Sequence, residues 1–252
     1  MLEVYYIIVI ALFGLLIGSF LNVCIYRIPK KESIVVGSSH CTNCNKKIKS
    51  YDLIPVFSYI FLMGKCRNCK AKISIRYPLI EAINCLLYLL IYFTFGLTLQ
   101  TILYCALFST LIVVTMIDFD TQEIPNGLSI FLLCISPLTF IINDIPFWHK
   151  LIGFVAASGI LLILAVLTDG FGGGDIKLMA VCGLLIGFKN ILLALFIGCV
   201  LGGLVGIIIL ITRKSKEKRP EMPFGPYLSI GIMIASLYGN QMINWYISLI
   251  QY

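Results

Sequence analysis

Apolar runs long enough to cross a bilayer recur along almost the whole chain. They cover about 4–25, 79–96, 99–117, 127–143, 150–168, 190–211 and 226–249, and a shorter run covers about 176–188. A transmembrane helix needs about 20 predominantly apolar residues. Sixty per cent of the 252 residues are hydrophobic and only 12% are charged, which is more apolar surface than a soluble core of this size can bury. The sequence therefore predicts an all-α, polytopic membrane bundle of about eight transmembrane helices.

The basic residues predict the orientation of this bundle. Eleven of the nineteen lysines and arginines lie between Arg27 and Arg76, and five more lie at 213–219. By the positive-inside rule both regions are cytoplasmic, which places the N-terminus outside. The first apolar run has no basic residues ahead of it, so we expect an uncleaved helix rather than a signal peptide. The net charge of +7 then indicates membrane topology and contact with anionic lipid headgroups, and no nucleic-acid partner.

The chain is expected to have three parts. Residues 1–26 form the first transmembrane helix, residues 27–78 form a small cytoplasmic loop domain, and residues 79–252 form the transmembrane core. In that core Gly198, Gly202, Gly203 and Gly206 follow one another at short spacing. Small residues at such spacing predict close approach of neighbouring helices.

Four cysteines in the 27–78 loop have the spacing of a zinc site. Cys41 and Cys44 form one CxxC pair, and Cys66 and Cys69 form the other. Two such pairs provide the four thiolates of a tetrahedral structural zinc site. A reducing cytoplasm disfavours disulfides, although redox thiols or disulfides remain the alternatives if the loop were outside. His40, beside Cys41, could replace one ligand, but a complete set of four cysteines makes it a bystander.

Two aspartates stand where apolar runs give way to polar backbone. Asp118 closes the run 111–117, and Asp175 follows three glycines and opens the run 176–180. A carboxylate at the edge of hydrocarbon is costly, so its default interpretation is functional. Asp120 and Glu123 are nearer the water, so we interpret them as solvated loop residues or as helix N-caps. For Asp175 alone, a helix N-cap is an equally good interpretation.

The predicted topology places Asp118 and Asp175 at the same membrane face, so the two can meet. Two adjacent carboxyls can share a proton: the ionised one deprotonates a water and the neutral one polarises a scissile carbonyl. The sequence contains no HExxH motif, and the predicted topology separates its two histidines. We therefore predict Asp118 and Asp175 as a catalytic pair.

Two other classes of function use the same features. One is an ion-coupled transporter with intramembrane carboxylates, for which inverted repeats and a midplane site are expected. The other is a non-catalytic membrane protein that uses its zinc knuckle to bind partners. The aspartates lie at helix ends and no repeat is visible, which favours the enzyme over the transporter.

Several motifs occur together and in order. They are Gly18-Ser-Phe-Leu-Asn-Val-Cys-Ile-Tyr-Arg-Ile-Pro29, Tyr51-Asp-Leu-Ile-Pro-Val-Phe-Ser-Tyr59, Gly64-Lys-Cys-Arg-Asn-Cys69, Ile73-Ser-Ile-Arg-Tyr-Pro-Leu-Ile-Glu81, Ile117-Asp118, Ile124-Pro-Asn126 and Gly172-Gly-Gly-Asp175-Ile-Lys-Leu178. With these motifs the chain resembles the type IV prepilin peptidases, the GxGD class of membrane aspartic proteases. The resemblance covers most of the chain.

The resemblance implies a bacterial cytoplasmic-membrane enzyme that cleaves the basic leader from prepilin or pseudopilin precursors of type IV pilus and protein secretion systems. It identifies Asp118 and Asp175 as the catalytic residues of an aspartic endopeptidase. It also implies N-methylation of the new N-terminus with S-adenosylmethionine, an activity associated with the cysteine-bearing loop. No methyl-donor site is visible in the sequence itself, so that half of the function depends on the resemblance alone.

Overall fold

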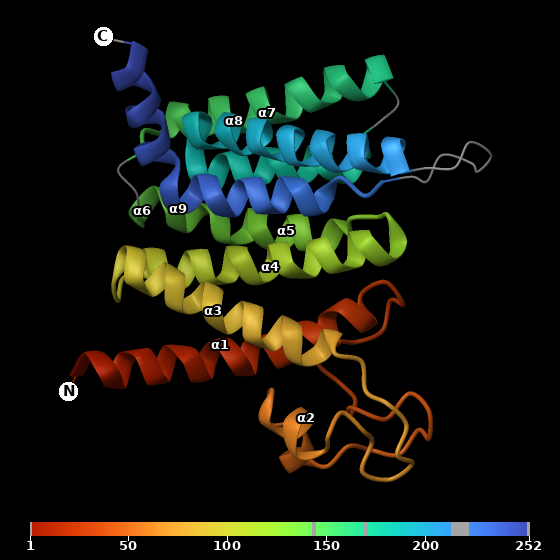
Figure 1. Cartoon of the computed structure of the whole chain (residues 1–252). Helices are drawn as coiled ribbons and strands as arrows, with labels where there is room; N and C mark the ends of the chain where they lie inside the picture. Colours follow the sequence, from red (N-terminus) through yellow and green to blue (C-terminus); the bar gives the residue numbers. More distant parts are fainter. Residues whose placement is uncertain (1, 143–144, 169–170, 213–221, 251–252) are drawn as a thin grey trace. The chain divides into compact units, whose positions relative to one another are not determined.

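The computed structural model describes residues 2–142, 145–168, 171–212 and 222–250. Its long helices are α1 (Leu2–Arg27), α3 (Arg76–Phe95), α4 (Leu99–Thr121), α5 (Asn126–Ile135), α7 (Phe147–Thr168), α8 (Gly173–Thr212) and α9 (Gly225–Ile250). Short ones are η1 (Ser50–Leu53), α2 (Phe57–Phe61), η2 (Ser136–Leu138) and α6 (Thr139–Ile142). The described residues contain no strand, which confirms the predicted all-α class (Figure 1). The basic cluster at 213–219 lies outside the described residues.

Five described helices are long and apolar enough to cross a membrane: α1, α3, α4, α7 and α8. The shorter apolar stretch Asn126–Ile142 is made of α5, η2 and α6. Helix α8 is interrupted at Gly187, whose φ of 80° and ψ of 169° are not helical. Figure 1 shows the two halves of α8 running back alongside each other. This break separates the two runs, 176–188 and 190–211, that the sequence predicts. The predicted total of about eight spans remains a prediction.

The chain divides into two compact units, Met1–Val113 and Val114–Tyr252. In the first unit α1 and α3 are in close contact at glycines, because a Cβ on Gly14 or on Gly18 would lie 2.7 Å from a backbone atom of α3. A buried polar chain adds to this contact. Asn84 Nδ2 donates to the Gly14 carbonyl at 2.7 Å, and Ser109 Oγ donates to Asn84 Oδ1 at 2.9 Å. Interhelical hydrogen bonds of this kind fix helix register inside a bilayer.

The second unit is assembled in the same manner. Gly183 lies against the backbone of Gly153, which joins α8 to α7. The predicted glycine contact face is only partly correct. A Cβ on Gly198 would lie 3.1 Å from Leu228 and one on Gly202 would lie 2.7 Å from Phe224, but Gly203 and Gly206 have no neighbour within 4 Å. A helix presents about one residue in three or four to a given neighbour, so only the 198 and 202 positions face α9.

Candidate active site, metal centre and cavity

Asp118 lies in the last turn of α4 and is buried, with 5% of its surface exposed. Its Oδ2 accepts a hydrogen bond of 2.9 Å from the backbone N–H of Gly225. Gly225 is the first residue of α9. The first N–H groups of a helix have no partner within the helix, and the helix dipole favours an anion there. The start of α9 therefore stabilises a charge on Asp118.

Asp175 lies in the first turn of α8 and is also buried, with 7% exposed. Its Oδ2 accepts a hydrogen bond of 3.2 Å from Gly172 N–H, while its own N–H donates to the Gly172 carbonyl at 3.1 Å. This reciprocal pair resembles a capping box, so the helix-cap interpretation accounts for one oxygen. Asp175 Oδ1 is buried and has no hydrogen-bond partner among the described residues. The second oxygen is thus left for a proton, a water or a substrate.

The structure brings both predicted aspartates together in the second unit, where their carboxyls lie close enough to interact electrostatically. Asp120, which the sequence placed nearer the water, is exposed. Two neighbours of the aspartate pair were not predicted from the sequence. Gly225 lies against Asp118, and Ile124 lies against Gly174, where an added Cβ would be 2.8 Å from it. The turn around Gly225, which lies between Phe224 and Pro226, is the signal that could have indicated a helix start beside the aspartates.

The four predicted cysteine ligands also converge. The sulfur atoms of Cys41, Cys44, Cys66 and Cys69 all lie within 4.8 Å of one another. Cys41 Sγ and Cys69 Sγ are 3.8 Å apart, which is close to the sulfur–sulfur separation in a tetrahedron with zinc–sulfur bonds of about 2.3 Å. The residues present therefore fit a four-coordinate zinc. His40 is not part of this group; its Nδ1 faces the Ser38 carbonyl at 3.4 Å.

The two CxxC turns have the same construction. The first turn is closed by Asn45 N–H donating to the Cys41 carbonyl, and the second by Lys70 N–H donating to the Cys66 carbonyl. Each turn also sends an amide to a sulfur of the other, since Asn43 Nδ2 lies 3.7 Å from Cys69 Sγ and Asn68 Nδ2 lies 3.7 Å from Cys44 Sγ.

Hydrogen bonding prepares one of these sulfurs for metal binding. The Ala71 backbone N–H, and after it the Asn43 amide, lower the pKa of Cys69 to about 6. Cys69 is therefore largely a thiolate, the form that binds zinc, at neutral pH.

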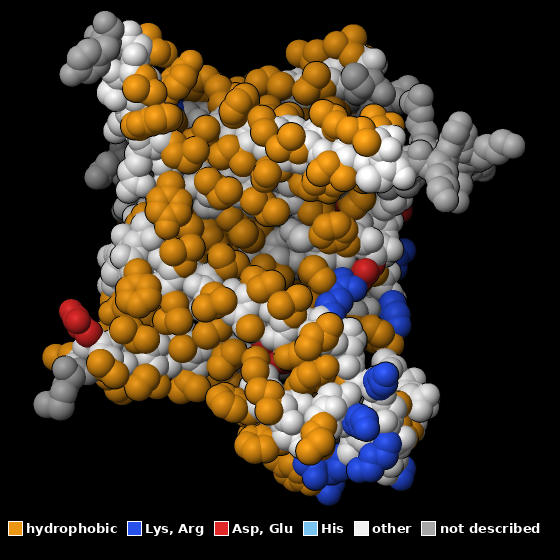
Figure 2. All heavy atoms as spheres, in the orientation of Figure 1, with side chains coloured by type: hydrophobic (Ala, Val, Ile, Leu, Met, Phe, Trp, Pro, Cys, Tyr) orange, Lys and Arg blue, Asp and Glu red, His pale blue; other side chains and the backbone are white. Residues whose placement is uncertain are grey.

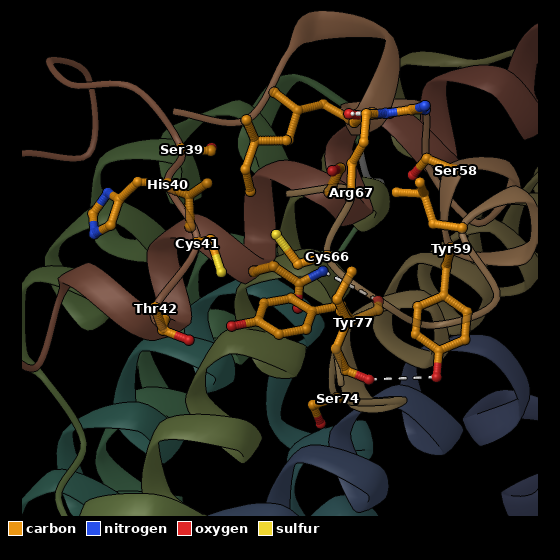
Figure 3. A pocket seen from close by; sticks show the side chains of 18 of the residues that line it. Ser39, His40, Cys41, Thr42, Ser58, Tyr59, Cys66, Arg67, Ser74 and Tyr77 are labelled. Carbon is orange, nitrogen blue, oxygen red and sulfur yellow. Dashed lines mark hydrogen bonds and ion pairs between the residues drawn. The ribbon is translucent and has the colours of Figure 1, made fainter. Parts of the chain in front are cut away.

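A cavity of about 840 Å³ lies beside this cysteine cluster, entirely within the first unit. The C-terminal half of α1, the cysteine-bearing loop, α2 and the start of α3 line it. Tyr26, Tyr59 and Tyr77 contribute aromatic rings to the wall, and Figure 3 shows the last two together with Cys41 and Cys66. Its volume falls in the range of about 300–1,000 Å³ that is typical of small-molecule sites.

Two carboxylates line the cavity in different environments. Asp52 accepts two hydrogen bonds from Arg67 Nε and one of 2.7 Å from Arg67 Nη2. These hydrogen bonds hold the pKa of Asp52 below its ordinary value. Glu81 is buried, with 8% exposed, and its Oε2 accepts a hydrogen bond of 2.7 Å from Val56 N–H. Val56 itself has a φ of 61° and a ψ of −52°, a backbone conformation that is strained for a β-branched residue. Glu81 thus joins the start of α3 to the loop.

The chain resembles known proteins over nearly its whole length. Residues 12–95 match the Bacterial Peptidase A24 N-terminal domain, and residues 105–207 match the Type IV leader peptidase family. A prepilin leader peptidase/N-methyltransferase of Bacillus subtilis is 34% identical over 96% of this chain and 98% of its own length. Proteins of the same name from Pseudomonas putida and Pseudomonas aeruginosa are 31% and 32% identical, each over 94% of this chain and over 92% and 91% of their own lengths. No solved structure matches the chain. With both family models matched in order and relatives of this identity over nearly the whole chain, the chain belongs to the type IV leader peptidase family.

Proposed function

We propose that this protein cleaves the leader from prepilin or pseudopilin precursors with Asp118 and Asp175, and then methylates the new N-terminus in the cavity beside the cysteine cluster. The observation that carries the peptidase half is the buried aspartate pair. Each carboxyl is held through Oδ2 by one backbone N–H, and Asp175 Oδ1 has no partner in the described part of the chain. The aspartates are therefore fixed in place while one oxygen stays available for chemistry.

The pair has what peptide hydrolysis requires. The ionised carboxyl takes a proton from a water whose oxygen bonds to the scissile carbonyl carbon, and the neutral carboxyl gives its proton to the carbonyl oxygen. When the tetrahedral intermediate collapses, the carbon–nitrogen bond breaks and the leaving amine takes up the proton that the first carboxyl took from the water. A hydroxyl of the intermediate returns its proton to the second carboxyl as the new carbonyl forms. Burial keeps bulk water out and strengthens the interaction of both carboxyls with the developing charges. The N–H groups of Gly225 and Gly172 hold the carboxyls in position during these transfers.

Membrane insertion of the substrate explains how the bond reaches the pair. A precursor with an apolar helix lies in the bilayer, so its cleavage site arrives at the depth of the helix ends that carry Asp118 and Asp175. Binding is then largely a matter of orientation. The family and the apolar helices support a multi-pass inner-membrane protein, and the distribution of basic residues supports a cytoplasmic face for both sites.

The cavity fits the second reaction in size, and its lining includes aromatic rings and two carboxyls among several basic side chains. The methyl donor S-adenosylmethionine would supply an activated methyl group carried on a sulfonium cation. The rings of Tyr59 and Tyr77 can face a cation. Glu81 contributes a carboxyl bound by Val56 N–H, whereas Asp52 is paired with Arg67. The same carboxylates attract the ammonium group of a newly formed N-terminus. In the transfer a nitrogen–carbon bond forms, the sulfur–carbon bond breaks and the amine releases a proton.

Single substitutions test the peptidase half. We expect Asp118→Asn and Asp175→Asn each to abolish cleavage of a precursor in detergent, as measured by mass spectrometry, with binding of the precursor retained. Asp120→Asn is the matched control, since Asp120 is exposed and two residues away on the same helix. Cleavage by either Asn variant at the rate of the control would overturn the assignment.

Substitutions at the cavity test the methyltransferase half separately. In the presence of methyl donor, Glu81→Gln and Asp52→Asn are expected to cleave the precursor and to leave the product unmethylated. The same spectrum reports both masses. A fully methylated product from both variants would remove the cavity from the proposal and leave the peptidase half intact.

A further inference from the structure

The cysteine-bearing loop carries an unusually apolar exposed segment. Within residues 54–63, which we name the apolar segment, Ile54, Phe57, Ile60, Phe61 and Met63 are exposed by 50%, 53%, 63%, 81% and 85%. The surfaces of soluble proteins rarely show large apolar side chains so close together, and such patches mark contact with a partner or a membrane. The segment therefore needs an explanation that the zinc site and the cavity do not give.

Helix α2, inside this segment, has two different faces. Phe57, Ile60 and Phe61 follow the i, i+3, i+4 spacing of one helical face, and all three are exposed. Ser58 and Tyr59 of α2, and Leu62 directly after it, are half-buried and line the cavity. Helix α2 is thus a wall, with the cavity on one side and a row of large apolar side chains on the other.

Helix α2 lies next to a membrane-spanning helix of the first unit, α1 (Figure 1). Leu16 and Phe20 of α1 are exposed by 58% and 44%, and Leu79 at the start of α3 is exposed by 53%. Leu16 and Phe20 also line the cavity together with α2, so α1 and α2 lie on neighbouring walls of it. In Figure 1 α2 lies beside the C-terminal half of α1. The apolar row therefore belongs to a part of the loop that lies beside the membrane-spanning helix α1 (Figure 1).

Charge around the segment favours an anionic membrane surface. Exposed lysines at positions 46, 47, 49, 65, 70 and 72 belong to the same loop, and Figure 2 shows the basic side chains of the loop gathered beside its apolar ones. Basic residues next to an apolar helix face are typical of segments that lie in the headgroup region of an anionic leaflet. The same lysines would repel a precursor with a basic leader.

From these observations we infer that the apolar segment inserts Phe57, Ile60 and Phe61 into the anionic lipid leaflet beside α1, so that lipid covers the outer wall of the cavity. The lysines of the loop hold the headgroups above it. This inference concerns lipid contact alone and does not depend on the chemistry assigned to the cavity.

Tryptophan fluorescence in nanodiscs tests this arrangement. The native Trp148 and Trp245 are replaced by Phe, and Phe61→Trp is introduced. Thr42→Trp is the matched control, because Thr42 is an exposed polar residue of the first CxxC turn in the same loop. With lipids brominated on the acyl chain, we expect at least twofold stronger quenching of Trp at 61 than at 42, and the reverse order with acrylamide. Zinc content verifies that each variant is folded, and Ile60→Trp replaces Phe61→Trp if that variant loses metal.

Three outcomes decide the question. Stronger lipid quenching at position 61 in phosphatidylglycerol than in phosphatidylcholine discs supports an anionic surface as the partner. Equal quenching at positions 61 and 42 overturns the inference. Shielding of position 61 from acrylamide only after a precursor is added also overturns it, since the segment would then be a surface for substrate.

Discussion

Replacing Gly225 by alanine should disable cleavage through a single atomic overlap. Gly225 N–H donates to Asp118 Oδ2 at 2.9 Å, and a Cβ at Gly225 would lie 2.7 Å from that same oxygen. Gly225 does not have a positive φ, and alanine favours a helix over glycine. The substitution therefore leaves the backbone of α9 intact and acts on Asp118.

The size of the effect follows from the distance that Asp118 must move. To restore an ordinary contact of 3.4 Å, Oδ2 must retreat by about 0.7 Å from its position 2.7 Å from the new Cβ. Retreat also weakens the hydrogen bond to the helix start. A displacement of about 1 Å in a reacting group can cost about 100-fold in rate, which corresponds to about 2.7 kcal/mol of activation free energy. We expect kcat to fall by about that factor with little change in KM.

The assay is single-turnover cleavage of a precursor in nanodiscs, followed by mass spectrometry. Gly127→Ala is the control, because Gly127 is in the first turn of α5 and a Cβ there meets nothing within 4 Å. Equal rates for Gly225→Ala and Gly127→Ala, in equally stable proteins, would refute the view that Gly225 holds Asp118 in place.

Three further predictions address the surroundings of the two sites. Gly174→Ala should lower cleavage, since its Cβ would lie 2.8 Å from Ile124, whereas Gly173→Ala, with no neighbour within 4 Å, should not; equal cleavage by the two variants would contradict this. Cys41→Ser should release zinc, as measured by elemental analysis, and abolish methylation while cleavage persists, because the aspartates belong to the other unit; a full complement of metal would disprove the four-cysteine site. Lys150→Met should lower the free energy of unfolding by about 1–3 kcal/mol, because the fully buried Lys150 Nζ donates to the Thr139 carbonyl and Oγ1; an unchanged melting temperature would contradict this.

Hydropathy predicted the helices well, because lipid contact imposes apolar residues over a length that the bilayer fixes. The predicted runs 79–96 and 99–117 correspond to α3 and α4, and the break between 188 and 190 lies close to Gly187. The ends are less well predicted. Helix α3 begins at Arg76 and passes through Pro78, since proline is tolerated in the first turn of a helix.

Interactions between distant residues could not be predicted from the pattern alone. The four cysteine ligands could be predicted, because each CxxC turn is a local structure and only two such turns had to come together. The hydrogen bond from Gly225 to Asp118 joins residues 107 positions apart, and no local signal specifies it. The burial of Lys150 is another such case: the Thr139 carbonyl and the face of the Phe140 ring, 4.4 Å away, replace water around its ammonium group.

The glycines near the aspartates have a role that the sequence did not suggest. Two of them donate directly to the carboxyls: Gly225 to Asp118, and Gly172 to Asp175. The two glycines differ in how much room a side chain would have. A Cβ at Gly172 would lie 3.4 Å from Asp175 Oδ2, an ordinary contact, whereas a Cβ at Gly225 would lie only 2.7 Å from Asp118 Oδ2. If glycine is required only because a side chain would collide with an aspartate, the Gly172→Ala variant should cleave at nearly the native rate, and the Gly225→Ala variant should not. Loss of cleavage in Gly172→Ala would show instead that the substrate backbone occupies that space.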